Sequence, residues 1–167
     1  LGIVGAANGF NMIAGFNGLE ALMGASIFAF LGFVSWKTNA LWLMLISFSY
    51  IAALLSFLVF NWNPAKIFPG NSFTYTTGAL IAIMAILGNM ERVVLIAFLP
   101  YFIELALKLR GKLKIESFGK PQKDGTLRVP EKCYSLTHVA MKYLPKVLRR
   151  AARENEVVAA ILAAQVL

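Results

Sequence analysis

Residues 19–60 read LEALMGASIFAFLGFVSWKTNALWLMLISFSYIAALLSFLVF and consist of two apolar stretches, 19–35 and 40–60, around a short polar link. A helix needs about 20 apolar residues to cross the hydrocarbon core of a bilayer, and about 17 are tolerated. Each stretch is therefore long enough for one crossing. Because the link WKTN has room only for a tight turn, the sequence predicts an antiparallel pair of transmembrane helices.

The composition of the whole chain agrees with this prediction. Of the 167 residues, 59% are hydrophobic and 14% are charged, which argues against a disordered chain and against a soluble globular domain. In lipid every backbone polar group must be paired within the protein, and a helix achieves this within one segment. We therefore expect an all-α, polytopic integral membrane protein with its transmembrane helices arranged in hairpins.

Further apolar stretches extend the pattern. Residues 73–88 and 93–107 flank a second short link, NMER, and predict a second hairpin. Residues 1–7 resemble the tail of an earlier span, and a last span begins at Val157. Since both ends of the chain lie in apolar runs, we expect the sequence to be an excerpt of a longer membrane protein.

The alternation of the spans predicts where the polar loops lie. If the links WKTN and NMER lie on one side of the bilayer, residues 8–18, 61–72 and 108–156 share the other side. The last of these carries thirteen of the sixteen Lys and Arg residues, so the positive-inside tendency places the shared side in the cytoplasm. The expected units are a bundle over 1–107 with two cytoplasmic substrate loops, a basic loop with an interfacial helix over 108–156, and the start of a last transmembrane helix over 157–167.

The basic segment has two parts. Residues 108–131 are rich in Gly, Pro and Lys and predict an extended loop or a small hairpin that turns at Asp124 and Gly125. Residues 134–153 carry apolar residues on one helical side, which is typical of an interfacial helix. Glu104 precedes Lys108 by one helical turn and predicts an ion pair. For six of the basic residues, attraction to anionic lipid is the alternative to phosphate binding: Lys108, Lys112, Lys114, Arg149, Arg150 and Arg153.

Several kinds of site are excluded by composition. Cys133, His138 and Asp124 are the only residues of their types in the chain. The chain alone therefore forms no disulfide, no cysteine metal cage, no pair of aspartates and no two-histidine metal site.

An amide-rich segment, NGFNMIAGFNGLE, covers residues 8–20. Asn8 and Asn11 share one helical face, and Asn17 and Glu20 follow. Amide side chains offer a donor and an acceptor, which suits a uracil edge or a sugar, and the amide oxygen can bind a hard cation. The alternative is tight helix packing, since Asn and Gly both favour it in membranes.

A second segment, NWNPAKIFPGNSFTY, covers residues 61–75. Pro64 and Pro69 impose a non-helical path, and Phe68 lies between turn formers, where an aromatic ring can stack on a nucleobase. The alternative is an interfacial aromatic belt, which accounts well for Trp62 and Tyr75. In the basic loop, Arg128 suits phosphate recognition, whereas a lone histidine such as His138 is more often structural.

The segments NGFNMIAGFNGLE, FNWNPAKIFPGNSFTY and SLTH, in this order, resemble the polyprenyl-phosphate sugar-1-phosphate transferases. The likeness is greatest to the archaeal and eukaryotic branch, the tunicamycin-sensitive UDP-N-acetylglucosamine–dolichyl-phosphate N-acetylglucosamine-1-phosphotransferases. It covers only the C-terminal half of such an enzyme. The paired aspartates of the family lie on an earlier cytoplasmic loop that this chain lacks.

The resemblance implies a role for individual residues. Asn8 and Asn11 match the two asparagines of the family's NAxN motif, the second of which helps to hold Mg²⁺, or Mn²⁺ in its place. Asn71 stands where the family's FxGD turn has a metal-binding aspartate. The implied catalytic residues are Asn11, Asn71 and His138, with Asn11 and Asn71 as metal ligands. The implied nucleotide-sugar residues are Asn8, Asn17, Glu20, Phe68 and Arg128. Among them, Asn17 reads the uracil and Phe68 stacks on the uracil ring.

The resemblance also implies a reaction. The enzyme transfers N-acetylglucosamine-1-phosphate from UDP-N-acetylglucosamine to a polyprenyl or dolichyl phosphate and releases UMP, which is the first step of lipid-linked oligosaccharide synthesis for N-glycosylation. The enzyme is expected in an archaeal cell membrane or an endoplasmic reticulum membrane. Its expected partners are the lipid bilayer and the N-terminal half of the enzyme, and no nucleic acid. A homodimer is left open. The competing interpretations are half of a membrane transporter and a lipid-binding structural subunit.

Overall fold

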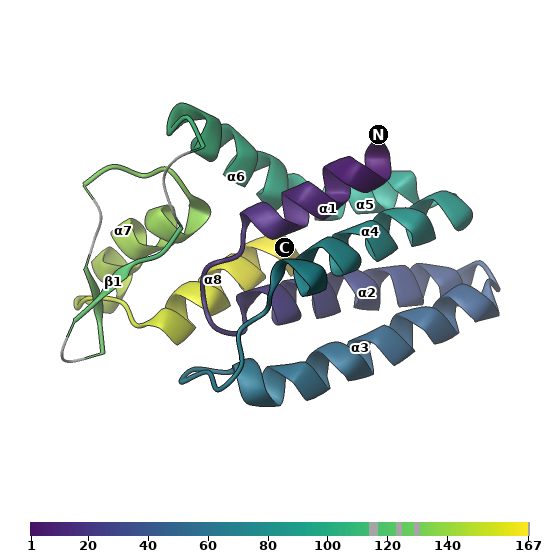
Figure 1. Ribbon diagram of the computed structural model, residues 1–167, viewed down its shortest axis with the longest axis horizontal. Coiled ribbons are helices and arrows are strands. Elements are labelled where there is room, and N and C mark those ends of the chain that lie inside the picture. The colour runs from purple at the N-terminus through teal and green to yellow at the C-terminus, as the bar shows by residue number, and fades with distance from the viewer. Residues whose placement is uncertain (114–116, 123–124, 129–130, 167) are drawn as a thin grey trace.

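A computed structural model describes residues 1–113, 117–122, 125–128 and 131–166 of the chain. The described part is mostly helical, with one small antiparallel hairpin (Figure 1). Its elements in chain order are α1 (Gly2–Met12), α2 (Leu19–Lys37), α3 (Leu41–Asn61), α4 (Asn71–Leu87), α5 (Glu91–Ala97), α6 (Leu99–Arg110), β1 (Lys120–Pro121), β2 (Leu127–Arg128), α7 (Leu136–Leu148) and α8 (Glu154–Val166).

The first predicted hairpin is present as α2 and α3, which run antiparallel and side by side (Figure 1). Both helices are long and apolar enough to cross a membrane, and among the described helices only these two meet that length. Helix α2 is largely enclosed, whereas α3 exposes Leu45, Phe48 and Val59 on its outer side. A continuous apolar face of this kind is stable against lipid or another protein rather than water.

The two predicted short links end their helices in the same way. Asn39 and Asn89 adopt left-handed backbone conformations, with φ of 57° and 52°. The N–H of the residue after each donates back across the turn, from Ala40 to the Ser35 carbonyl at 2.9 Å and from Met90 to the Ala85 carbonyl at 2.8 Å. Asparagine tolerates this conformation and so closes each helix tightly.

The predicted span over residues 93–107 is wrong as a single helix. The structure divides it into α5, which ends at Ala97, and α6, which begins at Leu99. Pro100 lies in the first turn of α6, where a backbone N–H would have no helical partner anyway. In the middle of a continuous helix, the missing N–H of Pro100 would leave one backbone carbonyl without a hydrogen bond. The proline therefore ends one helix and begins another.

Other predicted boundaries also shift. The loop predicted over 8–18 is shorter, because α1 continues through Asn8 and Asn11 to Met12. The loop predicted over 61–72 ends early, because α4 begins at Asn71, and the last helix begins before Val157, at Glu154. The predicted interfacial helix is shorter than 134–153 and occupies Leu136–Leu148.

A small hairpin in the basic segment is confirmed. β1 pairs antiparallel with β2, with Lys120 opposite Arg128. Gly125 in the connection has a φ of 77°, which suits a glycine in a turn. Asp124, the other predicted turn residue, and Lys114 lie outside the described residues.

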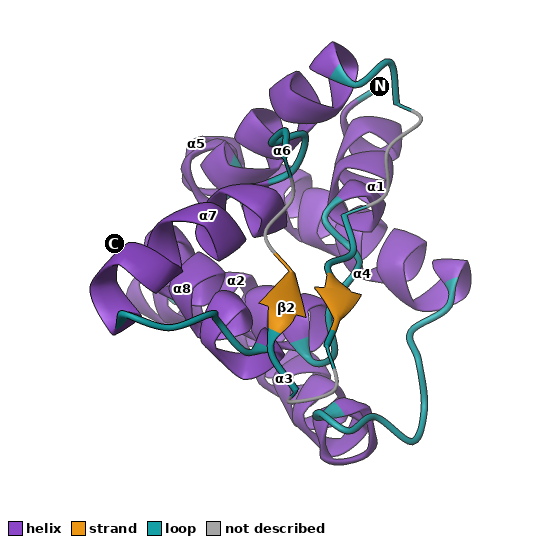
Figure 2. Ribbon diagram, turned by 90° about the vertical axis from the view of Figure 1, so that its left-hand side faces the viewer, coloured by secondary structure: helices purple, strands orange, loops and turns teal. Residues whose placement is uncertain are grey.

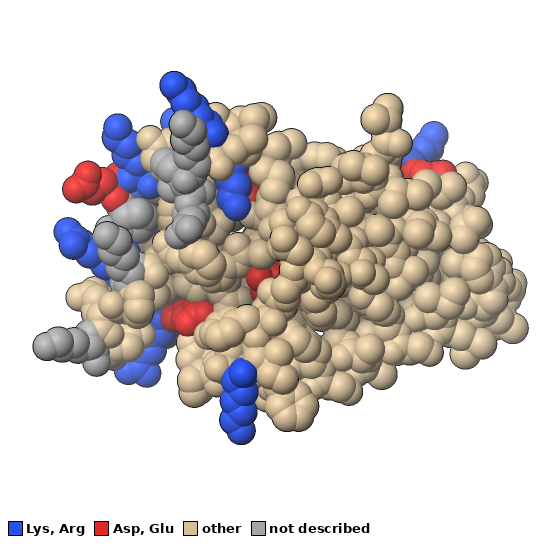
Figure 3. Space-filling view, viewed as in Figure 1, with Lys and Arg blue, Asp and Glu red and all other residues tan. Residues whose placement is uncertain are grey.

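The segments that join the helices are divided between the two ends of the bundle. The turns at Asn39 and Asn89 lie at one end, and residues 13–18, 62–70 and the basic segment lie at the other (Figure 1). Figure 2, which looks onto the second end, shows the β1–β2 hairpin in front of the helices. Most of the Lys and Arg side chains visible in Figure 3 gather there, and the rest of that face is almost free of charge. We call this end the polar end.

The contact between α1 and α4 depends on Gly78. A Cβ atom at this position would lie 2.5 Å from the Ala6 carbonyl oxygen and 2.8 Å from the Ala7 Cα, and neither backbone atom can rotate away. We expect Gly78→Ala to lower the free energy of unfolding by about 1–3 kcal/mol, as overpacking does elsewhere. Thermal unfolding in detergent measures the loss. Gly5→Ala is the matched control, because nothing lies within 4 Å of a Cβ there; equal melting temperatures for both variants would contradict the prediction.

Candidate active site

Asn61 connects the two polar segments that the sequence singled out. It is the last residue of α3, and its side chain is fully buried. Its Oδ1 accepts from the Gly18 N–H at 2.9 Å, and its Nδ2 donates to the Ile67 carbonyl at 2.8 Å. The amide thereby fixes the start of α2 against the turn over 62–70. No motif in the sequence assigns a role to Asn61, although an amide at the end of a long apolar helix is a usable signal.

Asn11 lies between α1 and α4. The Thr74 hydroxyl donates to Asn11 Oδ1 at 2.5 Å and also lies 3.2 Å from the Asn71 carbonyl oxygen. Asn11 Nδ2 donates to the Tyr75 hydroxyl at 3.4 Å. The structure thus brings Asn11 to the N-terminal turn of α4, where Asn71 is exposed. Thr74 and Tyr75 complete this group, and the sequence analysis missed Thr74.

The other predicted nucleotide-sugar residues are more scattered. Asn8 donates to the Val4 carbonyl at 2.8 Å, one turn earlier in its own helix. Asn17 is half-buried in the link before α2, and Phe68 is exposed on the turn after α3. Asn17 and Phe68 are held near each other through their neighbours, because Asn61 binds both Gly18 and Ile67. Asn8 belongs to no such connection among the described residues.

Glu20 faces inward. It is 2% exposed, and its Oε1 accepts from the Gly15 N–H at 3.0 Å. Its second oxygen is buried and has no hydrogen-bond partner within the described part of the chain. In this arrangement Glu20 shapes the backbone of the link over 13–18.

A buried carboxylate fastens the basic segment to the bundle. Glu104 is fully buried and accepts from the Ser135 hydroxyl at 2.8 Å, the Leu136 N–H at 2.7 Å and the Ser117 hydroxyl at 3.3 Å. The predicted ion pair with Lys108 is confirmed at 3.6 Å. Lys108 also donates to the Met12 carbonyl, so the end of α1 and the basic segment meet at α6.

His138 lies on the inner side of α7 and is buried. Its Nδ1 accepts from the Tyr134 N–H at 3.3 Å, and the ring makes a further hydrogen bond with the Phe118 backbone. Burial lowers the pKa of His138 below its ordinary value of 6.5. The backbone contacts give the ring a structural place, and its catalytic role stays a prediction. Arg128 is exposed on β2.

The residues that would hold a metal ion offer neutral oxygen. Within the described ranges no group of three or more His, Cys, Asp and Glu side chains could hold an ion. Asn11 Oδ1 has a second lone pair beyond its bond with Thr74, and Asn71 lies at the adjoining helix terminus. Amide oxygens are hard ligands that fit Mg²⁺, but they do not neutralise its charge.

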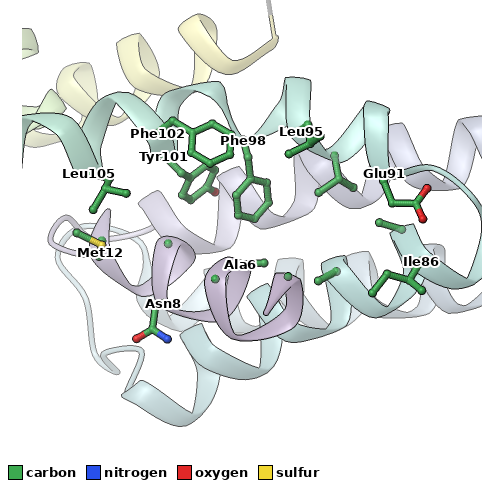
Figure 4. A pocket seen from close by; sticks show the side chains of 16 residues that line it. Ala6, Asn8, Met12, Ile86, Glu91, Leu95, Phe98, Tyr101, Phe102 and Leu105 are labelled. Atoms are coloured by element: carbon green, nitrogen blue, oxygen red, sulfur yellow. The ribbon is translucent and has the colours of Figure 1, made fainter.

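An apolar groove of about 530 Å³ runs along the bundle, from Ile86 and Glu91 near the Asn89 turn to Met12 near the polar end. It is bounded by α1 and α4 on one side and by α5 and α6 on the other (Figure 4). Phe98 and Phe102 lie above it in this view, whereas the Asn8 side chain points away from them. Met12 lines the groove and also accepts from Lys108, so the groove reaches the polar end.

A sequence profile described as Glycosyl transferase family 4 matches residues 1–89, and the chain belongs to this family. The family resemblance found from the motifs is thereby confirmed.

The relatives are named for related reactions. A Saccharolobus solfataricus protein, provisionally named a UDP-N-acetylglucosamine–dolichyl-phosphate N-acetylglucosaminephosphotransferase, is 44% identical over 81% of this chain and 43% of its own length. A Sulfolobus acidocaldarius protein with the same provisional name is 39% identical over 81% of this chain and 42% of its own length. A phospho-N-acetylmuramoyl-pentapeptide-transferase of Halalkalibacterium halodurans is 35% identical over 66% of this chain and 36% of its own length. The chain spans less than half the length of these relatives.

The buried imidazole of His138 predicts a pH dependence. A pKa below 6.5 in the folded state means that the unfolded state binds the proton more readily. Stability is therefore retained above about pH 6.5 and falls as the pH decreases through and below that value. We expect His138→Asn, which keeps an acceptor for the Tyr134 N–H but cannot be protonated, to lose less stability on acidification. The measurement is the melting temperature of both proteins at pH 8 and at pH 5.5. An equal fall in melting temperature between the two pH values in both proteins would refute the prediction.

Proposed function

We propose that the chain contributes to an enzyme that transfers N-acetylglucosamine-1-phosphate from UDP-N-acetylglucosamine to a polyprenyl or dolichyl phosphate and releases UMP. One observation carries the proposal: the link over 13–18, the turn over 62–70 and the basic segment meet at one end of the bundle, and an apolar groove along the bundle reaches the same end at Met12. A water-soluble nucleotide sugar and a membrane-embedded isoprenoid need these two environments next to each other.

The names of the relatives support the choice of substrates. Two of them are named for UDP-N-acetylglucosamine and dolichyl phosphate. In this assignment Asn17 and Phe68 take the uridine, and the apolar groove takes the isoprenoid. In this assignment the polar end faces the cytoplasm, following the positive-inside tendency. The product is the first lipid intermediate of N-glycosylation.

The proposed reaction needs little acid–base chemistry. A phosphate oxygen of the acceptor attacks the β-phosphorus of the nucleotide sugar, the bond to the UMP oxygen breaks, and UMP leaves. The second pKa of a phosphate monoester is about 6, so the nucleophile is already largely ionised near neutral pH. This agrees with the scarcity of His and Asp in the chain. The remaining requirement is to bring two anions together.

Cations and helix termini at the polar end meet that requirement. Arg128 is exposed on the hairpin, where its guanidinium can pair with phosphate. The free N–H groups at the start of α4 favour negative charge nearby. Asn11 and Asn71 would hold a Mg²⁺ ion, which when bound offsets charge on the diphosphate.

Binding of the donor is the direct test of the proposed function. We expect UDP-N-acetylglucosamine with Mg²⁺ to raise the melting temperature of the protein produced from its full gene, since a ligand at 100 times its dissociation constant adds about 2.7 kcal/mol of stability. GDP-mannose with Mg²⁺ is the matched control. Half of a transporter of another solute and a lipid-binding subunit both predict no uridine-specific shift, and such a result would exclude the proposal.

Asn71 provides a test of the metal site. Replacing its amide by a carboxylate adds one negative charge beside the proposed ion, so Asn71→Asp should lower the Mg²⁺ concentration needed for half-maximal turnover by roughly tenfold. A titration of turnover against Mg²⁺ measures this. Asn89→Asp is the matched control, because Asn89 is exposed at the opposite end of the bundle. An unchanged Mg²⁺ requirement in Asn71→Asp would show that Asn71 does not face the metal.

A further inference from the structure

Glu154 joins three distant parts of the chain. It is the first residue of α8 and lies near the end of the basic segment over 108–156. Its Oε1 accepts from the backbone N–H of Asn17 at 2.7 Å, and its Oε2 accepts from Asn63 Nδ2 at 2.6 Å. Both carboxylate oxygens are thus engaged, one by the link before α2 and the other by the turn after α3.

The two segments that Glu154 joins are those that carry Asn17 and Phe68. Asn61 already connects them from the buried side, through Gly18 and Ile67. Glu154 connects them a second time, from the half-buried side and from a different helix. Two separated attachments fix both the distance and the rotation of two segments, whereas one attachment leaves rotation free.

The way in which Asn17 is held is suited to recognition. Its backbone N–H is bound to Glu154, while its side-chain amide makes no hydrogen bond within the described part of the chain. The position of the residue is therefore fixed, and its donor and acceptor remain available to a ligand. Charge-assisted hydrogen bonds such as this one are stronger than neutral ones.

We propose that Glu154 is a positioning residue for the nucleotide pocket. It sets the spacing between Asn17 and the turn that carries Phe68, and so couples the end of the basic segment to the recognition of the uridine. This inference rests on the proposed function. Glu154 acts through Asn17 and Asn63 and does not itself touch the substrate.

The alternative role for Glu154 is electrostatic. A negative charge in the first turn of α8 stabilises that helix without any bridge. Two substitutions separate the effect of the negative charge from the effect of the length of the side chain. Glu154→Asp keeps the charge but shortens the side chain by one methylene, so it cannot hold both partners. Glu154→Gln loses the charge but keeps the reach, because the Asn63 amide can turn its oxygen toward the new NH₂ group.

The experiment measures KM for UDP-N-acetylglucosamine and kcat in the protein produced from its full gene. We expect Glu154→Asp to raise KM about tenfold, the effect of losing one charge-assisted hydrogen bond, and to change kcat less than about twofold. Glu154→Gln should raise KM less than Glu154→Asp does. Glu156→Asp is the matched control in the same helical turn, since Glu156 pairs with Arg150 at the surface, and it should behave as the unmodified protein.

A double variant tests the bridge itself. Asn63→Ala removes one partner, so adding Glu154→Asp to it should raise KM less than Glu154→Asp does alone. The inference is overturned if Glu154→Gln impairs KM more than Glu154→Asp, or if the effects of Asn63→Ala and Glu154→Asp on KM simply multiply. A protein without any uridine-specific binding overturns the proposed function and this inference with it, whereas an unaltered KM in Glu154→Asp overturns the inference alone.

Discussion

A polar group inside an apolar bundle must find its partner within the protein, and this requirement organises the polar end. Asn61 and Glu104 are both fully buried, and each meets it by binding segments far away in the chain. Asn61 binds the link before α2 and the turn after α3, and Glu104 binds the segment before α7. An unpaired carboxylate or amide in such a place is costly, so these contacts fix the loops as firmly as packing fixes the helices.

The helices were more predictable than the contacts at their ends. The apolar stretch over 19–35 became α2 (Leu19–Lys37), and the one over 40–60 became α3 (Leu41–Asn61), because length and hydropathy alone define such helices. The roles of Asn61 and Glu154 depend on partners in other segments, and Glu154 lies 137 residues from Asn17. Local sequence patterns carry no information about pairs at that separation.

The motifs identified two segments that the structure brings together at the polar end, and the functional roles of their residues stay predictions. The Thr74 hydroxyl contacts both the Asn11 side chain and the Asn71 backbone carbonyl, and a metal site shared by Asn11 and Asn71 stays a prediction. Glu20 points inward, and His138 accepts from a backbone N–H, although the family resemblance implied a nucleotide-sugar role for Glu20 and a catalytic role for His138. A motif defines which residue types are present, whereas their hydrogen bonds decide which of them remain available.

The predicted span that the structure divides lies along the apolar groove. The sequence predicted one helix over 93–107, but α5 ends at Ala97 and α6 begins at Leu99. Phe98, at the break, and Tyr101 stack at 4.5 Å and line the groove together with residues from both helices. Local rules of helix formation are often broken where a protein needs a cavity. The interruption beside Pro100 therefore lies in the wall of the groove, where an unbroken helix was predicted.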